Sequence, residues 1–289
     1  MTIVAFIGLG NMGGPMAANL VKAGHEVLGV DLVPELREAA AAAGVKIADS
    51  AAAAGADVVV TMLPAGKHVL SVWESLQAKP GALWIDSSTI DVESARKAHA
   101  IAQAKGARSI DAPVSGGVGG AKGATLTFMC GGADDAFAAA KPHLEKMGKR
   151  IVHCGGAGAG QAAKICNNMI LGATMIATCE AFVLGEKLGL SAQALYDVAS
   201  TSSGQSWSLT TYCPVPGPVP ASPANNGYKP GFAAALMLKD LKLSQEAALA
   251  SGANTPLGSA AAQLYALFNA AGGAGADFSG IIEFLRGRK

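Results

Sequence analysis

The sequence predicts two domains, an α/β domain at the N-terminus followed by an all-α domain at the C-terminus. Short β-branched runs alternate with alanine-rich helical stretches through about residue 155. This alternation is typical of a largely parallel sheet covered on both faces by helices. Only helical patterns follow from about Gly158. Because 289 residues are enough for two cores, we expect domains at residues 1–158 and 159–289.

The predicted elements follow the chain in a simple order. Seven apolar runs are predicted as strands: 3–7, 26–30, 57–62, 82–86, 107–111, 126–130 and 150–154. The helical stretches between most of them end in glycine, which suits a helix C-terminus. Four helical segments form the second domain: roughly 160–189, 191–201, 231–251 and 255–271. Between them, residues 213–230 hold six of the thirteen prolines, which favours a stiff surface connection that could also wall a cleft.

Composition and charge narrow the classes of function. Hydrophobic residues make up 51% of the chain and charged residues 15%, which favours a well-buried globular protein. The net charge of +1 gives no electrostatic reason to expect nucleic acid or a membrane surface as a partner. Five dispersed cysteines, without a C-x-x-C or H-E-x-x-H motif, predict free thiols, a reducing compartment and no metal site.

The location of the protein is predicted from two apolar segments. The N-terminal residues lack the basic start and the cleavage site of a signal peptide. The long apolar segment after Gly160 is interrupted by Lys164, Asn167, Asn168 and Glu180. It therefore falls short of the roughly 18 uninterrupted apolar residues of a membrane span. We expect a soluble cytoplasmic protein.

A glycine-rich turn follows the first predicted strand. Gly8, Gly10 and Gly13 form a G-x-G-x-x-G motif between that strand and a helix. The first glycine permits a tight turn, the second lets a pyrophosphate approach the backbone, and the third allows close helix–strand packing. The context predicts a Rossmann-type domain; the alternative is a tight turn without a ligand. The candidate cofactor-binding residues of the turn are Gly8, Leu9, Gly10, Asn11, Met12 and Gly13.

Asp31 ends the second predicted strand, eighteen positions after Gly13 (31 − 13). A carboxylate at this place accepts hydrogen bonds from the ribose hydroxyls of NAD and repels the 2′-phosphate of NADP. No arginine follows in "DLVPEL" to receive that phosphate. The sequence therefore predicts NAD as the cofactor. The alternative, a strand-end carboxylate in solvent, would leave the glycine pattern unexplained.

Three further stretches lie where predicted strands end, which is where open α/β sheets bind ligands. Leu63-Pro64 could lie against a cofactor or could be ordinary turn chemistry. Thr89 could bond a nicotinamide carboxamide or ribose, although Ser or Thr also commonly begins a helix. Ser115-Gly116-Gly117 offers a hydroxyl and bare N–H groups that suit a carboxylate. A flexible loop is the alternative there, and the pattern alone leaves both open.

Four motifs together resemble the β-hydroxyacid dehydrogenases, a family that includes 6-phosphogluconate dehydrogenase and tartronate semialdehyde reductase. They are "FIGLGNMGGPMAANL", "DAPVSGG", "GQAAKICNNMI" and "LMLKDLKLSQEAA", in this order and with appropriate separations. The resemblance covers essentially the whole chain. It implies a Rossmann-type domain, an all-helical domain and a cleft between them.

The resemblance also implies roles for single residues. The glycine turn, Asp31, Leu63, Pro64 and Thr89 would bind the cofactor. The substrate carboxylate would lie at Ser115, Gly116 and Gly117. Lys164 would be catalytic with Asn168 beside it, and both would contact substrate. Lys239 would approach cofactor and substrate, and Trp207 and Phe232 would line the pocket.

Lys164 and Asn168 are four residues apart, so both project from one face of a helix. Oxidation of an alcohol without a metal needs a side chain that removes the hydroxyl proton. Burial and a nearby oxidised nicotinamide would lower the pKa of Lys164 from about 10.4 and make it a usable base. The alternative is a lysine stem on apolar surface with its charge in solvent. For Lys239, the alternative is a surface ion pair with Asp240.

The resemblance implies NAD-dependent oxidation of a small β-hydroxyacid. The leading expectation is 3-hydroxyisobutyrate converted to methylmalonate semialdehyde, as in valine breakdown, on the strength of "SSGQSW" and the proline-rich loop. Serine, glycerate or tartronate semialdehyde, and 3-hydroxypropionate are alternatives. Imine reductases share the glycine turn, but similar enzymes lack the lysine. A non-catalytic NAD sensor is the rival from another class. The family also implies a homodimer or homotetramer.

Overall fold

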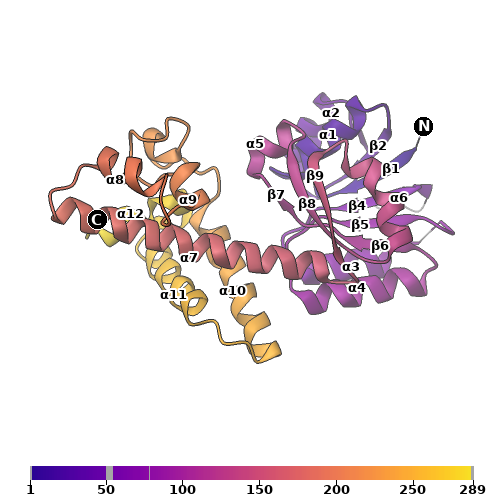
Figure 1. Ribbon diagram of the computed structural model, residues 1–289. Coiled ribbons are helices and arrows are strands. Elements are labelled where there is room, and N and C mark those ends of the chain that lie inside the picture. The colour runs from indigo at the N-terminus through magenta and orange to yellow at the C-terminus, as the bar shows by residue number, and fades with distance from the viewer. Residues whose placement is uncertain (1, 50–54, 78, 288–289) are drawn as a thin grey trace. The chain divides into compact units, whose positions relative to one another are not determined.

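The computed structural model describes residues 2–49, 55–77 and 79–287. The chain forms two compact units, one up to Lys164 and one from Ile165 onward. Helix α7 (Ala159–Lys187) runs from the first unit into the second (Figure 1). The predicted domain limits at residues 1 and 289 lie outside the described residues.

The first unit contains a mixed, mainly parallel sheet. Its strand order is β3-β2-β1-β4-β5-β6-β8-β7, and β9 pairs with β8. The bounds are β1 (Ile3–Ile7), β2 (Glu26–Val30), β3 (Lys46–Ile47), β4 (Val58–Thr61), β5 (Leu83–Asp86), β6 (Arg108–Asp111), β7 (Val114–Ser115), β8 (Leu126–Gly131) and β9 (Gly148–Gly155). The seven predicted strands are confirmed. The two-residue strands β3 and β7 were missed because two residues show no periodicity.

Strand β8 changes the direction of the sheet. It pairs antiparallel with β6 and β7 and parallel with β9. The strands β1, β2, β4, β5 and β6 are parallel, so their carboxyl ends meet at one edge. In this register Thr61 pairs with Asp86, and Asp86 pairs with Asp111. Three polar side chains therefore lie side by side where strands end.

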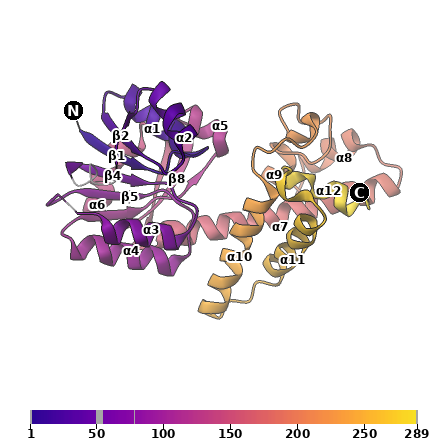
Figure 2. The same ribbon diagram turned by 180° about the vertical axis from the view of Figure 1, so that it is seen from behind.

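Helices cover both faces of the sheet, as predicted. In β1, Val4 and Phe6 face one apolar cluster, and Ala5 and Ile7 face the other. Helices α1 (Gly13–Lys22), α2 (Pro34–Ala42), α5 (Gly117–Lys122) and α6 (Asp134–Leu144) contribute to the first cluster. Helices α3 (Gly66–Ser75) and α4 (Val92–Ala104) contribute to the second. Figure 2 shows α1 and α2 on the opposite side of the sheet from α3 and α4.

The second unit is helical. Its helices after α7 are α8 (Ala192–Ala199), α9 (Trp207–Thr210), α10 (Ala234–Ser251), α11 (Pro256–Ala270) and α12 (Ile281–Leu285). The buried core includes Phe182 of α7, Leu241 of α10 and Tyr265 of α11. No strand follows β9 within the described residues. The prediction of an α/β domain followed by an all-α domain is confirmed.

The proline-rich segment is more than a surface connection. Cys213 and Val215 are buried in the core of the second unit, and the Ser222 hydroxyl donates to the Cys213 carbonyl. A short 3₁₀ turn, η2, covers Pro223–Asn226. The sequence did not reveal this packing because prolines fix φ and remove backbone donors, so the segment has the composition of a surface loop.

By length and composition, α7 alone among the described helices could cross a membrane. Lys164 and the two asparagines interrupt the apolar run, as expected, but the mean hydropathy of the helix remains high enough for a membrane span. Its packing explains the apolar character differently. Met175, Ile176, Cys179 and Phe182 of α7 are buried in the second core, so part of its apolar surface packs in a protein interior.

Candidate functional site

The glycine turn lies between β1 and α1, and each glycine has its own steric reason. A Cβ at Gly8, where φ is +97°, would lie 2.3 Å from the Met62 carbonyl oxygen. A Cβ at Gly13 would lie 1.9 Å from the Gly8 carbonyl oxygen. A Cβ at Gly10 would meet nothing within 4 Å. The first and third glycines are therefore required by the fold, whereas Gly10 has open space beside it.

Asp31 follows β2 and is tied to this turn. Its Oδ2 accepts a hydrogen bond from the Leu9 N–H at 2.6 Å, and its Oδ1 accepts one from the Val33 N–H at 2.9 Å. A carboxylate has about four lone-pair sites, so acceptor capacity remains for ribose hydroxyls. The contact with Leu9 was not predicted from the sequence. Asp31 thus also holds the glycine turn against the end of β2.

A cavity of about 400 Å³ borders the glycine turn at Leu9, Gly10 and Asn11. It continues along α1 to Lys22 and is also lined by α2 and by Lys122 of α5. The cavity lining therefore includes residues of the glycine turn but not Leu63, Pro64 or Thr89, the predicted contacts of the nicotinamide half.

Leu63, Pro64 and Thr89 lie in the loops that follow β4 and β5. The Leu63 N–H donates to the Ser88 hydroxyl at 2.8 Å. That hydroxyl in turn donates to Asp86 Oδ1 at 2.6 Å. Thr89 is half-buried next to Ser88. One serine therefore joins the two loops that carry the predicted cofactor contacts, a connection that the sequence analysis did not identify.

Asp86 is a buried carboxyl group at the centre of this connection. Its Oδ1 accepts hydrogen bonds from the Thr61 hydroxyl at 2.8 Å and from Ser88. Burial raises its pKa to about 6, the bonds from Ser88 and Thr61 oppose that rise, and nearby Asp111 adds to it. The unfavourable desolvation of the charged form is the largest of these causes.

Ser115, Gly116 and Gly117 lie at the end of β7. Ser115 is half-buried and pairs with Thr127 of β8. Gly116 has φ +132° and Gly117 has φ +60°, a left-handed region that side chains rarely adopt. The positive φ angles explain why glycine occupies both positions.

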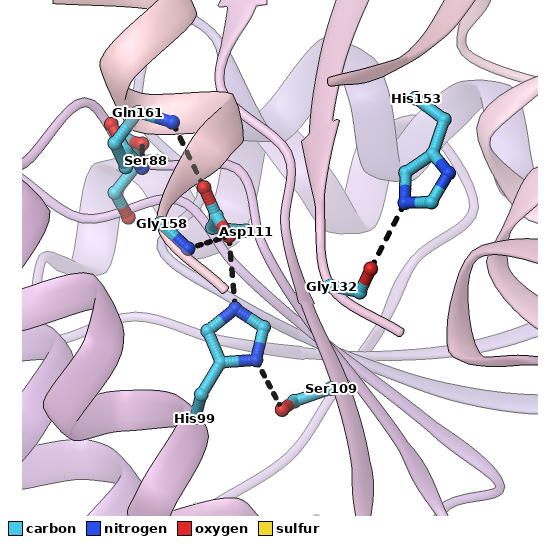
Figure 3. Close-up of polar contacts among 8 residues, drawn as sticks. All are labelled: Ser88, His99, Ser109, Asp111, Gly132, His153, Gly158 and Gln161. Atoms are coloured by element: carbon cyan, nitrogen blue, oxygen red, sulfur yellow. Dashed lines mark hydrogen bonds and ion pairs between the residues drawn. The ribbon is translucent and has the colours of Figure 1, made fainter. Parts of the chain in front are cut away.

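Lys164 lies in the second turn of α7 and is 7% exposed. This burial disagrees with the alternative in which the charge extends into solvent. At the start of this helix, Asp111 accepts hydrogen bonds from the Gly158 and Gln161 N–H groups. The Gln161 side chain donates one to the Ser88 carbonyl. Figure 3 shows these contacts. No role for Gln161 or Asp111 was predicted from the sequence.

Asn168 belongs to the second unit and is 2% exposed. Its Nδ2 donates to Asp240 Oδ2 at 2.5 Å, and its Oδ1 accepts from Asn167 Nδ2 at 3.0 Å. The Lys239 Nζ lies 3.9 Å from Asp240 Oδ1. The alternative of an ion pair with Asp240 agrees with this distance, but Asp240 is only 5% exposed, so the pair does not lie wholly at the surface. Asp240 joins Asn168 to Lys239, and no sequence signal beyond its place beside Lys239 identified it.

Trp207 and Phe232 also belong to the second unit. Trp207 is 51% exposed and stacks on Tyr212 with ring centroids 4.9 Å apart. Phe232 is half-buried and meets Phe278 edge to face at 5.8 Å. Tyr212 also stacks on Phe278, so one row of rings connects the two predicted pocket residues.

The structure thus gathers the predicted residues in two sets. The set in the first unit is Gly8, Leu9, Gly10, Asn11, Met12, Gly13, Asp31, Leu63, Pro64, Thr89, Ser115, Gly116, Gly117 and Lys164. The set in the second unit is Asn168, Trp207, Phe232 and Lys239. In the described part of the chain, no group of three or more His, Cys, Asp or Glu side chains could hold a metal ion.

Two family models match the chain. Residues 3–156 match the NAD-binding domain of 6-phosphogluconate dehydrogenase, and residues 158–285 match the NAD-binding domain of NADP-dependent 3-hydroxyisobutyrate dehydrogenase. A probable 3-hydroxyisobutyrate dehydrogenase of Mycobacterium tuberculosis is 56% identical over 100% of this chain and 99% of that protein. The chain belongs to the 3-hydroxyisobutyrate dehydrogenase family. It is accordingly an NAD(P)-dependent hydroxyacid dehydrogenase, and the Rossmann-type prediction is confirmed.

Other members of the family differ in substrate. The 3-hydroxyisobutyrate dehydrogenase of Pseudomonas aeruginosa is 50% identical over the full length of both chains. The NAD-dependent L-serine dehydrogenase of the same organism is 49% identical over 96% of each. The solved structure of Mycobacterium tuberculosis 3-hydroxyisobutyrate dehydrogenase with L-serine has a TM-score of 0.96 at 56% identity, over 99% of each chain. An imine reductase from Pseudomonas sp., 18% identical with a TM-score of 0.64, shares the fold alone.

Proposed function

We propose that this protein oxidises 3-hydroxyisobutyrate to methylmalonate semialdehyde with NAD, as a cytoplasmic step of valine breakdown. The observation that carries the proposal is the burial of Lys164 four residues before Asn168 on α7. The relatives named 3-hydroxyisobutyrate dehydrogenase, at 56% and 50% identity over the whole chain, support this substrate.

In the proposed reaction, Lys164 moves the proton. The neutral amine accepts the hydroxyl proton of the substrate while the C–O bond becomes C=O and the C–H hydrogen leaves as hydride. The bound dinucleotide supplies the hydride acceptor. In the reverse direction the ammonium returns the proton to the carbonyl oxygen. Oxidation needs the neutral amine, and reduction needs the ammonium.

In this proposal, the other predicted residues bind and orient the substrate. Asn168 retains one amide N–H beyond the bond to Asp240 and holds the substrate oxygen. The Ser115 hydroxyl and the backbone of Gly116 and Gly117 receive the substrate carboxylate. Lys239 provides positive charge for the carboxylate or cofactor, and Trp207 and Phe232 supply apolar contact for the methyl group.

NAD is preferred over NADP in this proposal. The glycine turn and the N-terminus of α1 receive the pyrophosphate, while Leu63, Pro64 and Thr89 approach the nicotinamide half. Asp31 binds the ribose hydroxyls, and its negative charge repels a 2′-phosphate. Its hydrogen bond from Leu9 supports this, because it fixes the carboxylate beside the turn that binds the pyrophosphate.

L-serine is the second candidate substrate. A relative 49% identical is named an NAD-dependent L-serine dehydrogenase, and a structure 56% identical was determined with L-serine. Serine is also a β-hydroxyacid and differs by carrying an ammonium where 3-hydroxyisobutyrate carries a methyl group. Contact with Trp207 favours the methyl group, although one methyl discriminates by only about 1–3 kcal/mol.

Initial rates of nicotinamide reduction test the function. We expect the highest kcat/KM for 3-hydroxyisobutyrate with NAD, a lower value for L-serine, glycerate and 3-hydroxypropionate, and at least about tenfold less with NADP, equivalent to about 1.4 kcal/mol. Lys164→Ala should lower kcat about 10²–10⁴-fold, the usual worth of a general base, with NAD affinity retained. Lys187→Ala, at the exposed end of the same helix, is the control.

Three results would contradict parts of the proposal. A higher kcat/KM for L-serine than for 3-hydroxyisobutyrate would make L-serine the preferred substrate. Equal efficiency with NADP and NAD would show that Asp31 does not select the cofactor. Tight NAD binding without turnover of any hydroxyacid would favour the alternative that the protein is a non-catalytic NAD sensor.

We also propose that the second unit carries the contacts of a homodimer or homotetramer. Large apolar side chains of α7 and of the turn after it are exposed in the single chain: Ile170 at 61%, Leu184 at 60% and Leu188 at 75%. Association would remove these surfaces from water, which is favourable in proportion to their apolar area.

A further inference from the structure

Asp111 holds the N-terminus of α7. It lies at the end of β6 and is 2% exposed. Its Oδ1 accepts a hydrogen bond from the Gly158 N–H at 2.8 Å, and its Oδ2 accepts one from the Gln161 N–H at 2.8 Å (Figure 3). The first N–H groups of a helix have no partner within the helix, and a carboxylate also interacts favourably with the positive end of the helix dipole. Asp111 therefore caps α7 from a neighbouring strand.

The carboxylate is itself held in place by His99 of α4. His99 Nε2 lies 2.9 Å from Asp111 Oδ1, and His99 Nδ1 lies 2.8 Å from the Ser109 hydroxyl. Both ring nitrogens are therefore engaged, and the ring cannot rotate without losing a hydrogen bond. In this way α4 and β6 together fix the orientation of the Asp111 side chain.

The backbone of α7 packs directly on this strand edge. A Cβ at Gly160 would lie 2.3 Å from the Met129 carbonyl oxygen and 2.7 Å from the Asp111 carbonyl oxygen. A side chain at this position would push the helix away from β6 and β8. The glycine explains how the helix comes close enough for Asp111 to reach its N–H groups.

Gln161 then connects α7 to the loop after β5. Its side chain is fully buried. The Oε1 accepts a hydrogen bond from the Ile90 N–H at 3.1 Å, and the Nε2 donates one to the Ser88 carbonyl at 2.7 Å. These two backbone groups stand on either side of Thr89, the predicted nicotinamide contact. A single amide thus holds both flanks of Thr89.

The connection continues to a second predicted cofactor contact. The Ser88 hydroxyl accepts from the Leu63 N–H and donates to Asp86. The start of α7 is therefore linked through Gln161 and Ser88 to the loops of both Thr89 and Leu63.

Lys164 follows Gln161 by three residues on the same helix, so it shares this orientation. From these contacts we propose that Gln161 and Asp111 are positioning residues, which hold the Lys164 amine in register with the loop that carries Thr89. The proposal rests on the proposed function, in which Lys164 moves the substrate proton and Thr89 meets the cofactor. Neither Gln161 nor Asp111 touches the reacting atoms.

The chemistry of position 161 requires an amide of this length. A donor is needed for Ser88 and an acceptor for Ile90, and a glutamine side chain supplies both. A methionine has nearly the same volume but neither group, so two buried backbone groups lose their partners and the loop shifts. A misplacement of about 1 Å in a reacting group can cost about a hundredfold in rate.

Gln161→Met tests the proposal in the full-length protein. We expect kcat with the preferred hydroxyacid to fall about 10- to 100-fold, while the dissociation constant of NAD, measured by equilibrium titration, changes less than about threefold, a difference below 1 kcal/mol. Gln193→Met is the matched control because Gln193 makes its hydrogen bond to Asp197 on the surface of α8. The control should retain the wild-type kcat.

A double variant distinguishes positioning from a general loss of structure. If Gln161 acts through Lys164, adding Gln161→Met to Lys164→Ala should not lower the residual rate further, because residues that act as a unit are not additive. An equal fall in both backgrounds would overturn the proposal. So would a folded Gln161→Met protein whose kcat stays within about twofold of wild type.

Two further comparisons keep the outcomes separate. Where Gln161→Met does not fold, Gln161→Asn replaces it, because a side chain one methylene shorter cannot reach both Ser88 and Ile90; the same results support or overturn the proposal. If Lys164→Ala retains the wild-type kcat, the proposed function is wrong whatever the result for the Gln161 variants. Loss of rate in Lys164→Ala but not in either Gln161 variant leaves the function standing and removes the positioning role.

Discussion

Two neighbouring carboxyl groups, Asp86 and Asp111, illustrate how local hydrogen bonding sets the behaviour of single residues. They pair across β5 and β6 and are each 2% exposed. Both oxygens of Asp111 accept hydrogen bonds. Asp86 receives all of its bonds on Oδ1, and its Oδ2 is buried without a partner among the described residues. Desolvation of that oxygen disfavours the charged form and explains the raised pKa of Asp86.

The raised pKa of Asp86 predicts a pH dependence of stability. The folded protein holds this proton up to about pH 6, whereas the unfolded chain releases it near pH 3.8. The stabilisation is therefore fully present below the unfolded pKa and is lost as pH rises through about 6. The free energy of unfolding of wild type, minus that of Asp86→Asn, should fall by about 2 kcal/mol between pH 4 and 7. Urea unfolding at several pH values measures it.

A surface substitution serves as the control for that measurement. Asp135→Asn changes an exposed carboxylate in the first turn of α6 and should follow wild type across the same range. A difference between wild type and Asp86→Asn that does not vary with pH would show that Asp86 ionises alike in the folded and unfolded states.

At the scale of an element, the glycines of the turn between β1 and α1 have different reasons. Two are needed for the fold, and one is predicted to be needed for ligand binding. Gly8 and Gly13 are required because a Cβ at either position would lie within 2.3 Å of a backbone oxygen. Gly10 borders open space in the protein itself. Only a ligand that approaches the backbone makes a glycine necessary at the second position.

Alanine substitutions test this separation. Gly13→Ala should destabilise the protein by about 1–3 kcal/mol through overpacking, as measured by chemical denaturation. Gly10→Ala should leave the free energy of unfolding within about 1 kcal/mol of wild type but weaken NAD binding at least about tenfold, as measured by titration. The two variants control for each other, and tight NAD binding by folded Gly10→Ala would contradict the assigned role.

Helix α7 shows how much of an element could be predicted from local pattern. The sequence predicted a helix at about 160–189, and the structure has one at Ala159–Lys187, because helical periodicity is carried by neighbouring residues. The attachment of its first turn could not be predicted. Asp111 lies 50 residues before Gln161 in the chain, and no local pattern indicates which carboxylate caps which helix.

At the scale of the whole molecule, the two units differ in what they leave exposed. The sheet of the first unit has helices on both faces, and most of its apolar strand residues are buried in two clusters, although Ile47 and Val152 are exposed. In the second unit, Leu236, Leu257 and Leu267 add to the exposed apolar side chains of α7. This distribution places the proposed association surface on the helical unit.

Light scattering coupled to size exclusion tests the association. We expect a mass of two or four chains at micromolar concentration. Leu184→Glu should shift the population toward the single chain, because a charge buried in an apolar interface costs several kcal/mol unless paired. Leu32→Glu is the control, since Leu32 is 94% exposed in the first unit. A single-chain mass for wild type would contradict the proposed homo-oligomer.

The sequence by itself determined the order of strands and helices, the glycine turn, and the helix that carries Lys164 and Asn168. These features depend on residues a few positions apart, whose periodicity and steric limits are visible without the fold. Only the tertiary structure decided that β8 runs antiparallel to β6, that Asp240 meets Asn168 from 72 residues away, and that Gln161 holds both flanks of Thr89. Hydrogen bonds between distant residues form only where packing brings their partners together, so no short stretch of sequence encodes them.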